Sequence, residues 1–174
     1  MGAGLGPLHE WHDFYLLIGT ASATLIGLMF VAASIGASYF TPEREAGLQA
    51  FLTPTVLHFT AVLVTCLVGT APLETRFSLA VILAAEGVAG LGYASRVWLH
   101  MRRGGMLGTI DLTDRLFYLG APLVAYFLMM ASGMALLRQP DIALEVVALA
   151  LVLLLLLGIR NAWDMTVWVV IRAK

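Results

Sequence analysis

Five long apolar stretches, separated by short polar ones, follow each other along this chain of 174 residues. Each is long enough to form a helix of about 20 residues, the length that crosses the hydrocarbon core of a bilayer. The pattern therefore predicts an all-α, polytopic integral membrane helical bundle that forms a single membrane domain over 1–174. The predicted transmembrane helices cover 14–40, 51–71, 77–101, 116–137 and 142–171.

The connections carry polar and helix-breaking residues. Thr41, Pro42 and Glu43 combine a Thr cap, Pro at the first helical position and an acid in the first turn, which is typical of a helix start. We therefore expect a short amphipathic turn at 44–50 ahead of the second span. The other connections are predicted at 72–75, 104–115 and 138–141.

Lys and Arg are distributed unevenly between the two sides of the predicted bundle. One side holds Arg44, Arg96, Arg102, Arg103, Arg115, Arg172 and Lys174, and the other holds Arg76 and Arg138. Short loops rich in Lys and Arg stay on the cytoplasmic side of a membrane. We therefore expect the N-terminus outside and the C-terminus in the cytoplasm.

Composition narrows the class further. The chain is 60% apolar and only 12% charged, whereas a soluble domain carries roughly 25% charged residues. Its net charge of −1 argues against nucleic acid, which needs a basic surface. The single cysteine, Cys66, cannot form an internal disulfide. Residues 1–7 contain no Lys or Arg, so we expect no cleaved secretory signal.

Two ionisable residues fall deep within the predicted spans. From the helical rise, Glu86 lies roughly 13 Å from the outer end of its helix, and His58 about 10 Å from the inner end of its own, so the two can approach each other. Glu86 is predicted either to relay protons or bind a cation, or to be a neutral carboxyl hydrogen-bonded to a neighbouring helix. His58 either titrates near neutral pH or makes a structural polar contact.

A second polar group is predicted nearer the inner surface. Arg160 and Asp164 are four residues apart, so they share a helical face and can pair. Asn161 is the only asparagine in the chain, and Arg96 is expected at a similar depth, where it can also meet Asp164. Two interpretations stay open: a structural lock between helices, or an inner gate or anion contact.

His9, Glu10, His12 and Asp13 precede the first span. Imidazole and carboxylate groups bind zinc or copper, but the segment lacks an HExxH-like spacing. We therefore expect a solvated helix start, with these residues as weak metal candidates. The sequence also contains no phosphate-binding glycine loop, nucleophile elbow or kinase-like set, so we expect neither a cofactor nor an enzyme.

An internal repeat with an offset of 68 residues is a further hypothesis. It pairs Pro54 with Pro122, Pro72 with Pro140, Val56 with Val124, Phe59 with Phe127, Gly90 with Gly158, Ala94 with Ala162 and Arg96 with Asp164. These pairs predict two parallel-related hairpins plus one extra helix. Coincidence within an apolar sequence of low complexity is the alternative.

Two motifs carry a resemblance to a known group of proteins. They are Trp11-His12-Asp13-Phe14-Tyr15 followed by Gly27-Leu28-Met29-Phe30-Val31-Ala32, and Gly158-Ile159-Arg160-Asn161-Ala162-Trp163-Asp164. With them the chain resembles a group of small uncharacterised bacterial integral membrane proteins. The resemblance implies a location in the bacterial inner membrane, and it implies no activity and no role for any residue.

These expectations combine into three functional hypotheses. The first is a small channel or transporter-like protein that moves an ion, proton or small solute along a path of Glu86, His58, Arg96, Arg160, Asn161 and Asp164. The small residues Gly19, Ala23 and Gly27 on one face of the first helix favour a homo-oligomer. The alternative is a non-conducting structural or regulatory subunit for another membrane protein. The third is a membrane enzyme that acts on lipid.

Overall fold

The computed structural model describes residues 10–36, 42–71, 76–103 and 115–172. Its elements are α2 (His12–Gly36), α3 (Pro42–Thr70), α4 (Arg76–Arg103), the π-helical turn η3 (Leu116–Gly120), α6 (Ala121–Ala135) and α7 (Pro140–Arg172). Because η3 continues into α6, the described residues contain five helices that are long and apolar enough to cross a membrane. The predicted all-α membrane bundle is confirmed.

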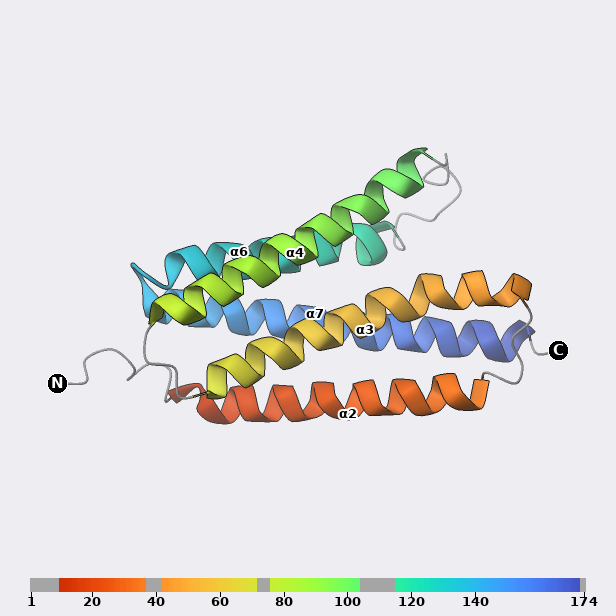
Figure 1. The fold of residues 1–174 in the computed structure, drawn as a ribbon, viewed down its shortest axis with the longest axis horizontal. Helices are drawn as coiled ribbons and strands as arrows, with labels where there is room; N and C mark the ends of the chain where they lie inside the picture. Colours follow the sequence, from red (N-terminus) through yellow and green to blue (C-terminus); the bar gives the residue numbers. More distant parts are fainter. Residues whose placement is uncertain (1–9, 37–41, 72–75, 104–114, 173–174) are drawn as a thin grey trace.

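Successive helices run in opposite directions along the bundle (Figure 1). We call the end where α2, α4 and α7 begin the N-end, and the end where these three helices finish the C-end. The principal contacts join α2 to α3, α3 to α7, α7 to α6, and α6 to α4. Helix α7 is accordingly the most buried of the five and α2 the least.

A continuous apolar core fills the bundle toward the N-end. Its fully buried members include Tyr126 and Met129 of α6 and Leu144, Leu151 and Leu154 of α7. Glycines let α4 approach α6 closely: a Cβ on Gly87 would come within 2.5 Å of the Met130 backbone nitrogen. Small residues allow this kind of backbone contact between membrane helices, and here they fix the middle of α4 against α6.

Several predicted boundaries differ from the structure. The separate turn expected at 44–50 is wrong, because α3 is one continuous helix of 29 residues with Pro54 inside it. Helix α6 ends at Ala135 and α7 begins at Pro140, so the connection covers 136–139 and lies two residues earlier than the predicted 138–141. Gln139 N–H donates to Ala135 O at 2.8 Å and closes this connection. Residues 37–40 of the first predicted span lie outside the described residues.

Some features of the structure agree with the proposed repeat, and the packing of the helices does not. Helices α3 and α6, the first of each proposed hairpin, run in the same direction (Figure 1). Gly90 packs against the ring of Tyr126, and its predicted equivalent Gly158 packs against the ring of Phe59, so each glycine meets an aromatic ring of the opposite hairpin. However, α6 packs on α7, whereas α4 packs on α6 and touches α3 little. The two hairpins are therefore not packed alike.

Candidate functional site

Helix α4 diverges from α3 and α7 toward the C-end (Figure 1). Residues of these helices and of η3 and α6 line a cavity of about 690 Å³. We call it the C-end cavity. Its polar lining residues are Thr53 and His58 of α3, Tyr93, Arg96 and His100 of α4, Tyr118 of η3 and Asn161 of α7. Arg96 and His100 are exposed, whereas His58 and Asn161 are only 2% and 3% exposed. The cavity therefore extends from an exposed mouth to a buried floor.

The floor of the cavity contains a buried hydrogen bond between two helices. Nδ1 of His58 lies 2.9 Å from the hydroxyl of Tyr126, and either atom can donate, depending on the imidazole tautomer. The Tyr126 ring occupies the space beside Gly90, where a Cβ would come within 2.1 Å of it. The two residues are also 68 positions apart, the offset of the proposed repeat. Equivalent residues that touch lie near a local symmetry axis, so this contact supports the repeat.

Glu86 is one helical turn from Gly90, on the N-end side of Tyr126. Its Oε2 accepts a hydrogen bond of 2.5 Å from the Thr65 hydroxyl of α3. His58 and Glu86 therefore have different hydrogen-bond partners, Tyr126 and Thr65, and no described hydrogen bond joins the two predicted residues directly. Polar groups consequently extend from the cavity floor toward the middle of the membrane.

Arg160 and Asp164 form the predicted ion pair, with Nε 3.7 Å from Oδ2 and both side chains 33% exposed. The Arg160 guanidinium also lies 4.0 Å above the Phe117 ring, and the Tyr118 hydroxyl donates to Asp164 Oδ2 at 2.5 Å. These contacts join α7 to η3. The suggested contact of Arg96 with Asp164 is wrong within the described residues: Asp164 uses Arg160 and Tyr118, while Arg96 lines the cavity.

The π-helical turn explains how Tyr118 reaches this position. Pro122 has no backbone N–H, so the α-helical bond to Tyr118 O four residues earlier cannot form. Instead the Ala121 N–H donates to Leu116 O, five residues back. Such turns widen a helix locally and are common at functional sites. Here the turn directs Phe117 toward Arg160 and Tyr118 toward Asp164.

Asn161 is the most informative residue of the floor. Its Oδ1 is buried and has no hydrogen-bond partner among the described residues, although the side chain lines the cavity. Leaving a buried polar atom unpaired costs about 1–3 kcal/mol, and native proteins rarely do so without a reason. Because Asn161 and Arg160 are adjacent in a helix, their side chains point in different directions. The residues predicted as one inner layer therefore lie in two environments: Asn161 lines the cavity, and Arg160 contacts η3.

Three of the four predicted metal candidates lie among the described residues, at the start of α2. His9 lies outside the described residues, and Glu10, His12 and Asp13 are exposed. Across the described ranges, no three His, Cys, Asp or Glu side chains are grouped so that they could hold a metal ion. These residues are therefore separate from the C-end cavity and from the polar groups at its floor.

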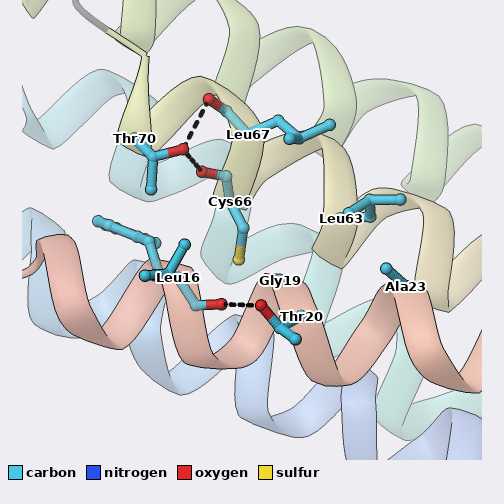
Figure 2. A pocket seen from close by; sticks show the side chains of 9 residues that line it. Leu16, Gly19, Thr20, Ala23, Leu63, Cys66, Leu67 and Thr70 are labelled. Carbon is cyan, nitrogen blue, oxygen red and sulfur yellow. Dashed lines mark hydrogen bonds between the residues drawn. The ribbon is translucent and has the colours of Figure 1, made fainter.

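A smaller pocket of about 190 Å³ lies between α2 and α3 toward the N-end; we call it the α2–α3 pocket (Figure 2). Cys66 points from α3 toward Gly19 of α2. Tyr15, Thr20 and Thr70 bring hydroxyls to the pocket lining. The two threonine hydroxyls bond within their own helices: Thr20 donates to Leu16 O at 2.7 Å, and Thr70 to Cys66 O at 2.9 Å. The surface of the pocket is therefore mainly apolar, and neither Thr20 nor Thr70 presents an unpaired hydroxyl to it.

Sequence reasoning identified His58, Arg96 and Asn161 but missed the tyrosines. Tyr93, Tyr118 and Tyr126 all contribute to the cavity or its floor, yet a tyrosine in an apolar helix resembles an ordinary packing or interfacial residue. The offset of 68 could have found Tyr126, because it places this tyrosine opposite His58. No comparable signal marks Tyr93 or Tyr118.

The fold defines the class: this is a multi-pass helical membrane protein. No family model matches the chain, and neither a curated protein nor a solved structure matches it. The proposal of a function therefore depends on the cavity and its polar floor.

Proposed function

We propose that this protein is a small transporter that admits a solute through the C-end cavity and moves a proton along the polar groups beyond its floor. The observation that carries this proposal is the cavity itself, because it connects an exposed mouth with two buried polar side chains, His58 and Asn161. Ionisable groups at membrane depth are costly to bury and commonly mark a path for ions or protons.

The residues beyond the floor form the proposed proton relay. His58 and Tyr126 share a hydrogen bond, and Glu86, which accepts a hydrogen bond from Thr65, lies further along α4 toward the N-end. Imidazole, phenol and carboxyl groups all exchange protons. The apolar core toward the N-end, with Leu83, Leu151 and Leu154 fully buried, favours a carrier that changes conformation over an open pore within one protomer.

The proposal includes a location and an assembly. The Lys and Arg distribution supports a cytoplasmic C-end, and the resemblance to bacterial membrane proteins supports the inner membrane. Helix α2 supports a homo-oligomer, because it is the least buried helix and nothing lies within 4 Å of a Cβ added at Gly27. A second copy of the chain would cover this surface.

A non-conducting structural or regulatory subunit is the second candidate function. The observation that favours it is the set of contacts around Asp164, which joins α7 to η3 through Arg160 and Tyr118. In that case the buried polar groups hold helices together, and neither protons nor solutes move when the purified protein is placed in liposomes.

Proton flux in proteoliposomes tests the proposal. With a membrane potential set by potassium and valinomycin and a pH dye inside, the wild-type protein should acidify the vesicles faster than empty liposomes. Glu86→Gln should abolish the effect, because the amide can still accept the Thr65 hydrogen bond but cannot exchange a proton at neutral pH. The control Glu10→Gln changes an exposed acid at the start of α2 and should leave the flux unchanged. Wild-type flux equal to that of empty liposomes would overturn the proton relay.

A further inference from the structure

The floor of the C-end cavity contains a hydrogen-bond acceptor that is unpaired among the described residues, which suits a ligand that carries a donor. Asn161 is 3% exposed, its Oδ1 has no partner among the described residues, and the side chain lines the cavity. An amide oxygen can only accept. A ligand that satisfies this atom must therefore bring an O–H or N–H group to the floor.

The mouth of the cavity favours a negatively charged ligand. Arg96 lines the cavity with an exposed, positively charged guanidinium, and the exposed His100 lies on the same helix one turn further along. Neither Asp nor Glu is among the described residues that line the cavity. A cation would meet only like charge there, whereas a carboxylate or phosphate would be attracted.

Between the mouth and the floor the walls are mostly apolar. They include Pro54, Ala94, Val97, Met101 and Pro122. From Tyr93 to His100 the helical rise gives a depth of about 10 Å. The volume of about 690 Å³ falls within the range of ligand pockets, roughly 300–1,000 Å³. The ligand therefore needs an apolar middle part as long as a short alkyl chain.

We propose that the C-end cavity binds an amphipathic organic anion whose hydrogen-bond donor is at the end opposite its charge. The donor pairs with Asn161 Oδ1, the anionic group lies near Arg96, and the apolar part contacts the walls between them. This assignment names a substrate class for the proposed transporter. It rests on that proposed function only because both treat the C-end cavity as the entry site.

Three short probes of matched length separate the two polar ends. They are ω-hydroxyoctanoate, which has both, octanoate, which lacks the donor, and octane-1,8-diol, which lacks the charge. In calorimetric titration of the purified full chain in nanodiscs, ω-hydroxyoctanoate should bind about tenfold more tightly than either other probe, because one paired buried group is worth on the order of 1.4 kcal/mol. Equal binding of all three probes would overturn the proposal.

Two variants assign the ends to residues. In Asn161→Ala the hydroxyl should lose its advantage, so that ω-hydroxyoctanoate and octanoate bind alike. In Arg96→Gln the carboxylate should lose its advantage, so that ω-hydroxyoctanoate and the diol bind alike. Arg96 is exposed, so this variant keeps the test decisive even if Asn161→Ala folds poorly. A preference for the hydroxyl that survives in folded Asn161→Ala contradicts the assignment.

Ser22→Ala is the matched control. Ser22 is fully buried and donates to Phe59 O at 2.7 Å, so the variant also removes one buried polar group, but Ser22 does not line the cavity. The order of probe affinities should be unchanged in this variant. If Ser22→Ala removes the preference as Asn161→Ala does, the effect reflects general destabilisation and the assignment fails.

The ligand could be a lipid headgroup or a soluble anion, since both can combine a hydroxyl with a charge. Native mass spectrometry of the purified protein separates them: phosphatidylglycerol retained by the wild type and lost in Asn161→Ala indicates the lipid, and probe binding without retained lipid indicates a soluble anion. Neither result would overturn the proposal. If the protein distinguishes the probes but shows no proton flux, transport is refuted and the ligand class stands. If it shows proton flux but binds the probes equally, the ligand class is refuted and transport stands.

Discussion

The C-end cavity and the α2–α3 pocket differ in how their polar atoms are satisfied. In the α2–α3 pocket, Thr20 and Thr70 donate to carbonyls of their own helices (Figure 2). In the C-end cavity, Asn161 Oδ1 at the floor is buried and unpaired among the described residues, and the mouth at the other end carries Arg96. The comparison teaches that volume alone does not define a site. An unpaired buried acceptor distinguishes a surface suited to a polar ligand from an ordinary gap between helices.

The largest expected effect concerns the helix that forms one wall of the cavity. In Gly87→Ala the new Cβ would come within 2.5 Å of the Met130 backbone nitrogen, so α4 must move away from α6. We expect a loss of about 3 kcal/mol in unfolding free energy, because overpacking against backbone cannot be relieved by a rotamer change. Chemical unfolding in mixed detergent micelles measures it.

Gly92→Ala is the control on the same helix, since nothing lies within 4 Å of a Cβ added there. It should be neutral or stabilise the protein by up to about 1 kcal/mol through helix propensity. Equal losses for Gly87→Ala and Gly92→Ala would contradict the close α4–α6 contact and the position of the cavity wall.

An intermediate effect is expected at the other side of the cavity. Tyr118→Phe removes the hydrogen bond to Asp164 Oδ2 but keeps the aromatic ring. We expect a loss of about 1 kcal/mol, at the lower end for bonds to a charged group because Asp164 is one third exposed. The same unfolding assay measures it. An unchanged unfolding free energy would show that η3 is held to α7 without this bond.

The smallest effects contrast two hydroxyls of α2. Ser22→Ala removes a buried bond to Phe59 O of α3 and should cost about 1 kcal/mol. Thr20→Val removes only a bond to Leu16 O within α2 and should change stability by less than about 0.5 kcal/mol. If Thr20→Val proves as costly as Ser22→Ala, the α2–α3 pocket is not the satisfied surface described above.

The sequence predicted the parts of this molecule that depend on local pattern. Five apolar stretches became five helices, and the spacing of Arg160 and Asp164 predicted their ion pair. It could not predict features that depend on how helices are arranged. The contact between α4 and α6 and the hydrogen bond between His58 and Tyr126 both require distant segments to meet. Residue depth placed Glu86 and His58 near each other but could not show that each has a different hydrogen-bond partner.

The most direct test of the cavity as a binding site is the stability of Asn161→Leu without added ligand. Leucine has a similar shape and removes the unpaired buried amide, so we predict that the unfolding free energy rises by about 1–2 kcal/mol while binding of ω-hydroxyoctanoate loses its dependence on the hydroxyl. Such a gain in stability with a loss of selectivity is expected where a residue is kept for function. A fall in unfolding free energy as large as that of Ser22→Ala would contradict the account, because it would show that the Asn161 amide is already satisfied within the protein.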